Sequence, residues 1–376
     1  MKTVLLENAI KKVQYKEKVP RNKFLPEGKY PIISQEQDLV NGFWDDDGLL
    51  MSFKNPVTIF GDHTKILKFI DFDFVLGADG VKILDPIDEI DPKYFYYALK
   101  NIELEDLGYA RHFRILKQAK IAYPESIEEQ KRVVKKLDEA FAAIDKAKEN
   151  TEKNLKNSRE LFGVGMNNLF GEIKEPGIEP LGDLCKVEIG RTPSRADFSL
   201  WGVDGGTKNI WVSIADLNHV DESSTINDSK EYVSNKAVPR MKLVKKGTLL
   251  VSFKLTLGRL AYAGRDLFTN EAIAALSLKD KSKISNEYLY YFLRFFDWDK
   301  AAEGSDKIKG KTLNKAKLQD IEVFYPKTID EQDEIVRELD QLSKQTEDLH
   351  ELFQKKLEVL EELRQSILKQ ALEGKL

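Results

Sequence analysis

One stretch of this chain occurs twice, and it constrains the fold more than any other feature of the sequence. The first copy begins at Tyr123 and reads YPESIEEQKRVVKKLDEAF, and the second begins at Tyr325 and reads YPKTIDEQDEIVRELDQLS. Tyr-Pro, Ile, Glu-Gln, Val, Leu and Asp recur at one constant offset. Recurrence of this kind indicates an internal duplication.

Each copy predicts the start of a long helix. Ser126 and Thr328 are suited to be N-caps, and Glu129 and Glu331 follow three residues later to complete capping boxes. Apolar residues then recur mostly every three or four positions for roughly forty residues without proline, which is typical of a coiled-coil seam. Two unrelated exposed helices are the alternative, but they would leave the repeated Tyr-Pro and capping box unexplained. The residues expected to pack along the two helices are Val134, Leu137, Phe141, Ile144, Leu155, Val336, Leu339, Leu349, Phe353, Leu360 and Ile367.

The composition is typical of a soluble globular protein with two or three domains. Hydrophobic residues make up 41% of the 376, and no apolar run approaches the roughly eighteen residues of a membrane span. The N-terminal MKTVLLENAIKK turns polar too early for a signal peptide. A single cysteine, Cys185, excludes a disulfide framework and a multi-cysteine zinc site, so we expect a cytoplasmic protein.

The regions that precede the two helices are predicted to be strand-rich and duplicated. Short apolar runs alternate with Gly, Pro, Asn and Asp, and a helix is expected after Asp91-Pro92. GTLLVSFK at 247 resembles GLLMSFK at 48, and EYLYYFLRF at 287 resembles KYFYYALKN at 93. We therefore predict an α/β (α+β) fold, in which two duplicated strand-rich domains are separated by two long antiparallel coiled-coil helices. The expected bounds are 1–124 and 173–326 for the domains, and 125–172 and 327–376 for the helices.

Basic segments that lack acidic neighbours are the candidate binding sites. The net charge of −4 gives no global signature of nucleic-acid binding, so such a role depends on local patches. GYARHFRILKQAK and KIKGKTLNKAK each precede a long helix, and IGRTPSR lies beside a turn. Because arginine pairs with phosphate or guanine, we predict two similar polyanion-binding half-sites, with solvated helix faces as the alternative. The candidate residues are Tyr109, Arg111, His112, Arg114, Lys117, Arg191, Thr192, Arg195, Lys307, Lys309 and Lys311.

Neither a catalytic site nor a metal site is predicted. Gly310-Lys311-Thr312 is not a phosphate-binding loop, because the preceding glycine, Gly304, is one residue too far away. Asn55-Pro56 lacks the second proline and the aromatic residue of the adenine-methyltransferase motif. The four histidines are scattered without the spacing of metal ligands. We interpret the chain as non-catalytic.

These motifs together resemble one family, the specificity (S) subunits of type I restriction-modification systems. YPESIEEQKRVV and YPKTIDEQDEIV are similar to the start of the family's conserved spacer helices, and RQSILKQALEGKL is similar to its closing segment. GKYPII, IFGDHT, GYARHF, IGRTPSR and GTLLVS resemble marks of its target-recognition domains. The resemblance covers essentially the whole chain.

The resemblance implies a function in DNA recognition. Each of the two domains would read one half of a split, asymmetric site on double-stranded DNA, and the helix pair would set the distance between the halves. Two methyltransferase (M) subunits with S-adenosylmethionine would methylate adenine at N6, and restriction (R) subunits with ATP and Mg would cleave. The chain itself would carry no cofactor. A non-catalytic coiled-coil scaffold whose globular domains bind protein partners is the alternative; it would not retard duplex DNA with a steep salt dependence.

Overall fold

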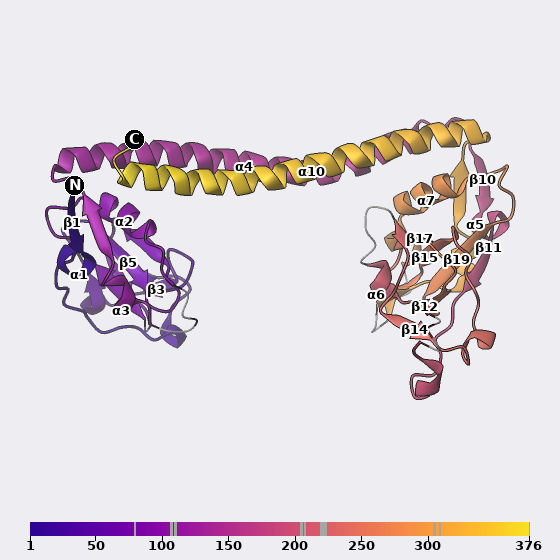
Figure 1. Ribbon diagram of the computed structural model, residues 1–376, viewed down its shortest axis with the longest axis horizontal. Coiled ribbons are helices and arrows are strands. Elements are labelled where there is room, and N and C mark those ends of the chain that lie inside the picture. The colour runs from indigo at the N-terminus through magenta and orange to yellow at the C-terminus, as the bar shows by residue number, and fades with distance from the viewer. Residues whose placement is uncertain are drawn as a thin grey trace. The chain divides into compact units, whose positions relative to one another are not determined.

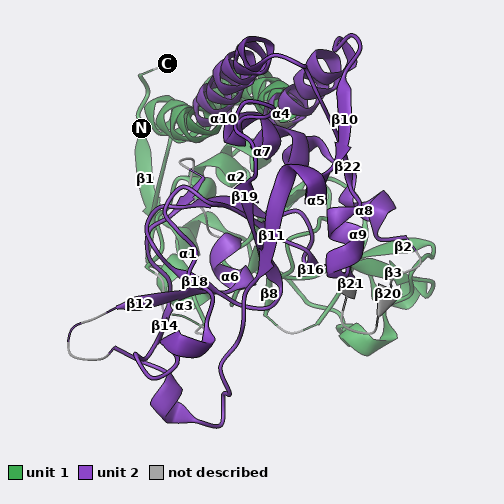
Figure 2. Ribbon diagram, turned by 90° about the vertical axis from the view of Figure 1, so that its right-hand side faces the viewer, with its two compact units in different colours: residues 1–154, 353–376 green, residues 155–352 purple. Residues whose placement is uncertain are grey.

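The computed structural model divides the chain into two compact units, which are coloured separately in Figure 2. One unit comprises residues 1–154 and 353–376, and the other comprises residues 155–352. Each unit therefore contains one strand-rich domain and parts of both long helices. The structure describes the whole chain except residues 79, 106–107, 109–110, 204–205, 207, 219–223, 304–305, 308–309 and 376, and it describes only the backbone at residues 159, 306–307 and 310–311.

The first strand-rich domain, drawn in indigo to purple in Figure 1, consists of a two-stranded ribbon and two small sheets. Strand β1 pairs antiparallel with β9, and the sheets have the strand orders β6-β5-β8 and β3-β2-β7-β4. Strand β5 is buried along its whole length because it is the central strand of its sheet and both of its faces are covered. The elements are β1 (Lys2–Leu5), α1 (Leu6–Ala9), β2 (Tyr30–Ile33), β3 (Gly42–Trp44), β4 (Leu50–Met51), β5 (Val57–Gly61), β6 (Leu67–Ile70), β7 (Phe74–Leu76), β8 (Val81–Leu84), α2 (Pro92–Lys100), α3 (Phe113–Leu116) and β9 (Lys120–Tyr123).

The helix expected after Asp91-Pro92 is α2. The Asp91 carboxylate accepts hydrogen bonds from the backbone N–H groups of Lys93 and Tyr94, and Pro92 occupies the first turn, where its missing N–H costs nothing. The buried face of α2 carries Tyr94 and Phe95, which belong to the same core as Phe60 of strand β5. The sequence prediction of this helix is confirmed.

The second strand-rich domain has a larger central sheet. Its strands have the order β11-β19-β15-β17-β13, and a ribbon and two further small sheets flank it. The elements are β10 (Gly177–Pro180), α5 (Leu181–Leu184), β11 (Cys185–Ile189), β12 (Asn209–Val212), α6 (Ile214–Leu217), β13 (Thr225–Ile226), β14 (Glu231–Val233), β15 (Leu249–Ser252), β16 (Lys254–Leu255), β17 (Leu260–Ala263), β18 (Phe268–Thr269), β19 (Ile273–Leu278), α7 (Asn286–Phe295), α8 (Trp298–Ala301), β20 (Asp306–Lys307), β21 (Gly310–Thr312), α9 (Lys315–Gln319) and β22 (Glu322–Tyr325).

The two domains share one topological framework. Strand β5 pairs with β6 and β8, as β15 pairs with β17 and β19, and ribbon β1-β9 matches ribbon β10-β22. Helices α2 and α7 also match, since the hydroxyl of Tyr94 donates to the Ala122 carbonyl and that of Tyr288 donates to the Phe324 carbonyl. One sequence comparison was wrong. GTLLVSF forms β15, whose counterpart is β5, whereas GLLMSF contributes β4 of a different sheet.

The glutamine of the repeated stretch joins each long helix to its domain. Gln130 is buried; its Oε1 accepts the Asp91 N–H at 2.7 Å, and its Nε2 donates to the carbonyls of Glu89 and Pro124 at 2.9 and 2.7 Å. Gln332 repeats the arrangement with the Ser285 N–H at 2.9 Å and the carbonyls of Lys283 and Pro326 at 2.8 and 2.9 Å. This explains why Gln recurs in both copies.

The long helices are α4 (Ile127–Gly171) and α10 (Ile329–Leu372), and they pack antiparallel. In the first unit Lys148 lies 2.8 Å from Glu361, and Arg364 pairs with Asp145. In the second unit α4 contacts α10 at Gly165, where an added Cβ would lie 2.1 Å from Leu342 Cδ2. The fold class predicted from the sequence is confirmed. No helix among the residues with a described placement is both long and apolar enough to cross a membrane.

The apolar stripes of α4 and α10 contact the domains as well as the partner helix. Phe141 of α4 meets the Tyr97 ring of α2 edge-on, with centroids 5.4 Å apart. Among the residues named for helix packing, five are buried, namely Leu137, Phe141, Ile144, Val336 and Leu339. The other six are partly buried, namely Val134, Leu155, Leu349, Phe353, Leu360 and Ile367. Part of the apolar stripe of each long helix therefore packs against a strand-rich domain.

Candidate nucleic-acid interface

In the first domain, the basic segment before the long helix is attached to the end of strand β5. The Asp62 carboxylate accepts the Phe113 N–H at 2.8 Å, and the Asp62 carbonyl accepts the His112 N–H at 2.9 Å. Asp62 directly follows β5 and is buried. The anchor holds α3 in place and leaves Arg111 and Arg114 exposed to solvent.

His112 does not belong to the exposed surface. Its ring is fully buried, and Nδ1 lies 3.1 Å from the Asp62 carbonyl oxygen. The expectation that His112 contacts DNA is therefore wrong for this structure, because a buried imidazole cannot reach a base or a phosphate. Tyr109, the neighbouring candidate, lies outside the described residues.

Two lysines converge on one aromatic ring in this segment. The ammonium of Lys117 lies 5.7 Å from the centroid of the Phe113 ring, and that of Lys82 lies 5.6 Å from it. Lys82 was missed in the sequence because it stands in strand β8, far along the chain from the basic segment. Strand β8 has the sequence VKIL, in which Lys82 stands between two apolar residues. This alternation is the sequence signal that could have identified Lys82 as a residue on the outer face.

In the second domain, the IGRTPSR segment leaves the edge strand β11 through a tight backbone contact. A Cβ at Gly190 would lie 2.2 Å from the Thr269 carbonyl oxygen, so only glycine fits there. The next residue is held by its backbone, since the Arg191 N–H donates to Thr269 and the Trp211 indole donates to the Arg191 carbonyl. The Arg191 side chain is exposed and donates to the carbonyl of Arg240 at 3.2 Å.

The other two candidates of this segment already have acidic partners. Arg195 forms a two-point ion pair with Glu231 and lies 3.9 Å from the ring centroid of Trp201. This pairing lowers the pKa of the Glu231 carboxyl and raises the pKa of Arg195. The Thr192 hydroxyl donates to Glu271. To bind a phosphate, Arg195 would have to weaken or break its contact with Glu231, and Thr192 its contact with Glu271.

An exposed aromatic residue next to Arg195 was also missed. Phe198 is 84% exposed although its neighbour Leu200 is buried. The turn that carries it is held by Ser199, whose carbonyl accepts the Ser234 hydroxyl and whose own hydroxyl accepts the Lys236 ammonium at 2.6 Å. Nothing in the local sequence marks this phenylalanine as exposed, because the turn is formed by contacts from residues far along the chain.

The third group of candidates lies around a hairpin. Strands β20 and β21 pair with each other, and β21 also pairs with β16. Lys307 and Lys311 belong to these strands, whose side chains are not described, and Lys309 lies outside the described residues. The short helix α9 follows; its Lys315 and Lys317 are exposed, and Asn314 caps it. Helix α9 precedes β22 and α10 as α3 precedes β9 and α4, which is the correspondence expected from the sequence.

These surfaces carry groups that are suited to binding. Within the part of the chain that the structure describes, no group of three or more His, Cys, Asp or Glu side chains could hold a metal ion. Burial raises the pKa of the Cys185 thiol to about 12, which keeps it protonated and unreactive at neutral pH. The arrangement offers exposed cations and an exposed ring on rigid supports, the groups that contact phosphates and bases.

Comparison with known proteins assigns both halves of the chain to one family. The family described as "Type I restriction modification DNA specificity domain" matches residues 9–156 and 177–361. The specificity subunit of the type I restriction enzyme EcoR124I/EcoR124II of Escherichia coli is 26% identical over 222 residues, 55% of this chain and 52% of that protein. The MjaIX specificity subunit of Methanocaldococcus jannaschii is 28% identical over 204 residues, 52% of this chain and 43% of that protein. The matched region thus spans about half the length of these relatives.

Two solved structures share the fold over the full chain. One comes from a study of complex assembly and conformational transition of the type I R-M system; its TM-score is 0.72 at 16% identity, and the match covers 100% of this chain and 98% of that one. The other is the HsdS subunit from Thermoanaerobacter tengcongensis, with a TM-score of 0.64 at 18% identity and coverage of 100% and 97%. At these identities the likeness concerns the fold alone.

Proposed function

The chain belongs to the type I restriction-modification DNA specificity family, and we propose that it selects the DNA sequence on which such a system acts. The observation that carries the proposal is the duplication of one framework, in each copy of which a basic segment precedes the strand that leads into a long helix. Two related surfaces on one chain suit a site with two half-sequences. Because the basic segments of the two copies differ in sequence, the two half-sequences would differ as well.

In this proposal the partner subunits carry out the methylation and cleavage reactions. Two methyltransferase subunits would bind S-adenosylmethionine and methylate adenine at N6 in each half of the site. Restriction subunits would use ATP and Mg for cleavage. This chain would hold the duplex in register while a target adenine is turned out of the stack into a methyltransferase pocket. Such an assembly would work in the cytoplasm, where the DNA is.

The exposed cations would divide into those that position the DNA and those that read it. Arg111 and Arg114 in the first domain and Arg191 in the second are exposed and make no ion pair among the described residues, so their charges are available to phosphates or guanine. Lys311 stays in the proposal on its sequence alone. Phe198 adds an exposed ring that could stack on a base.

Duplex binding as a function of salt tests these assignments. The chain, assembled with its methyltransferase subunits, is titrated with labelled duplex, and the logarithm of affinity is plotted against that of salt concentration. Each single change of Arg111, Arg114, Arg191 or Lys311 to Ala should lower the slope by about one unit per lost phosphate contact. Lys356→Ala, an exposed change on α10, is the matched control. Unchanged slopes in all four variants would remove these residues from the DNA surface, and a chain that never binds duplex would favour the protein scaffold.

A domain exchange tests the two-half organisation directly. Residues 173–326 are replaced by the corresponding domain of a relative, and the methylated adenines of the host genome are mapped by single-molecule sequencing. We expect only one half of the methylated sequence to change, since each domain has its own core. A change in both halves would contradict separable domains.

A further inference from the structure

In the first unit, an ammonium group of the chain itself occupies a small site made by an acid and aromatic rings. Asp138 of α4 accepts a hydrogen bond from the Tyr97 hydroxyl at 2.5 Å and an ion pair from Lys93 Nζ at 2.8 Å. The same Nζ lies 6.0 Å from the centroid of the Phe69 ring, and this ring packs on Tyr96 with centroids 5.7 Å apart. A carboxylate on one side and the face of an aromatic ring on the other are suited to hold an alkylammonium.

The second unit repeats this framework without the ammonium. The Tyr291 hydroxyl donates to Asp340 as Tyr97 donates to Asp138, and the rings of Tyr262 and Tyr290 stack with centroids 5.4 Å apart and planes at 28°. The alignment of α2 with α7, which sets Tyr94 against Tyr288, places Glu287 where the first unit has Lys93. An acid therefore stands at the position that the cation has in the first unit.

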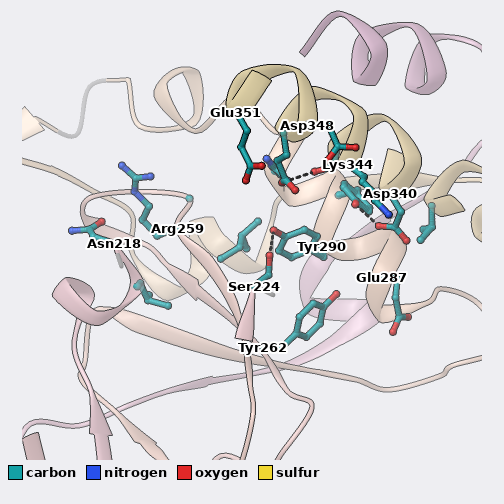
Figure 3. A pocket seen from close by; sticks show the side chains of 18 residues that line it. Asn218, Ser224, Arg259, Tyr262, Glu287, Tyr290, Asp340, Lys344, Asp348 and Glu351 are labelled. Carbon is teal, nitrogen blue, oxygen red and sulfur yellow. Dashed lines mark hydrogen bonds between the residues drawn. The ribbon is translucent and has the colours of Figure 1, made fainter. Parts of the chain in front are cut away.

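A cavity of about 820 Å³ lies at this position (Figure 3). The two stacked tyrosines line it, and Ser224 holds the Tyr290 hydroxyl at 2.8 Å. Its volume is within the range of about 300–1,000 Å³ typical of small-ligand pockets. In the first unit Lys93 lies between the Asp138 carboxylate and the Phe69 ring, whereas here Glu287 and Asp340 both line the open cavity.

Acidic groups outnumber basic ones around the cavity. Five carboxylates line it, against three cations, and among the described residues none of the five forms an ion pair. One of the cations, Arg294, lies 4.3 Å from the centroid of the Phe162 ring. Burial, followed by the nearby charges of Glu287 and others, raises the pKa of the Tyr262 hydroxyl. The five carboxylates are Glu287, Asp340, Glu347, Asp348 and Glu351, and the cations are Arg259, Arg294 and Lys344.

We infer that this cavity binds an alkylammonium group, which would lie against the Tyr262–Tyr290 pair and between the carboxylates of Glu287 and Asp340. Lys93 of the first unit shows the arrangement with the ammonium in place. The group can come from a free polyamine or from a lysine side chain of a partner protein, which present the same chemistry. The inference depends on the comparison of the two halves and not on DNA recognition.

Calorimetric titration of the full chain with spermidine at low ionic strength tests the free ligand. We expect one site, lost or weakened at least about tenfold by Glu287→Lys, which supplies the on-chain cation that Lys93 provides in the first unit. Glu334→Lys, the same charge change on an exposed part of α10 outside the cavity, is the matched control and should bind as the parent does. Conversely, Lys93→Glu should open a second site and double the stoichiometry. Circular dichroism checks that each variant is folded.

Assembly with the methyltransferase subunits distinguishes the two sources. If the ammonium belongs to a partner lysine, Glu287→Lys should weaken assembly at least about tenfold, Glu334→Lys should not, and spermidine should compete. If it belongs to a free polyamine, spermidine binds and assembly is unchanged. The inference is overturned if spermidine does not bind and assembly is unaffected, or if Glu334→Lys has the same effect as Glu287→Lys, since either result would leave only general electrostatics.

Discussion

The first and second halves of the molecule share two sets of polar contacts and differ in residues that surround them. The glutamine at the start of each long helix and the Tyr–Asp pair about two turns further along form the same hydrogen bonds in both halves. Yet Lys93 corresponds to Glu287, and the small sheets outside the shared framework differ. A buried polar group without its partner costs more than a changed surface residue, so duplication preserves the interior first.

The ends of the long helices give the largest expected contrast. Phe170, in the last turn of α4, packs on Phe292 and Phe295, whereas the repeat offset places Leu372 at the same point of α10 in the first unit. Phe170→Ala should lower the free energy of unfolding by about 4 kcal/mol, and Leu372→Ala by about 2–3 kcal/mol because it removes less buried surface. Urea denaturation of both variants gives the comparison. Equal decreases in the free energy of unfolding would show that the two helix ends are packed equally tightly against their domains.

The repeated glutamines should be equivalent. Gln130→Ala and Gln332→Ala each remove three hydrogen bonds and leave a buried N–H and two carbonyls without their partner, so each should cost about 2–3 kcal/mol. Hydrogen exchange of the first turns of α4 and α10 should accelerate in the affected half. Gln354→Ala, exposed on α10, should change neither quantity. A loss confined to one half would break the equivalence.

A buried lysine distinguishes the first half in its response to pH. Lys68 is 4% exposed, and burial lowers its pKa to about 8, below the value of about 10.4 in an unfolded chain. Between about pH 8 and 10 the unfolded state binds more protons, so the free energy of unfolding should rise with pH by up to about 1.4 kcal/mol per unit. Burial raises the pKa of Tyr94 to about 12, which reverses the trend above about pH 10.

Thermal unfolding across this pH range, compared with Lys68→Met, isolates the contribution of the lysine. The variant should lose the rise, and Lys54→Met, an exposed change, should keep it. A rise that persists in Lys68→Met would assign the effect to another group.

Two glycines in α4 give the smallest contrast. An added Cβ at Gly163 meets nothing within 4 Å, so Gly163→Ala should raise the free energy of unfolding by about 0.5–1 kcal/mol through helix propensity. Gly165 faces Leu342 of α10, where the new methyl would displace a side chain, and Gly165→Ala should gain less or lose stability. Denaturation midpoints of the two variants measure the difference. An equal gain at both positions would mean that Leu342 moves aside freely.

The sequence by itself determined the duplication, the starts of both long helices, the helix after Asp91-Pro92 and the family. These features depend on residues close together in the chain, since a capping box or an apolar stripe is complete within a few turns. The same holds for the basic segments, whose composition is local. The sequence of a basic segment does not reveal which of its side chains are exposed and which are buried or paired with an acid.

Only the tertiary structure decided which side chains of the basic segments are exposed, buried or paired. Arg195 is paired with Glu231, thirty-six positions away, and His112 is buried against Asp62, fifty positions away. The counterpart of strand β15 is β5, although the sequence GLLMSF at residue 48 is more similar to that of β15. The position of a strand in a sheet is defined by the strands with which it pairs and not by local sequence similarity. Burial and charge pairing arise between segments distant in sequence, so the candidate surface, unlike the helices, was determined by the folded chain.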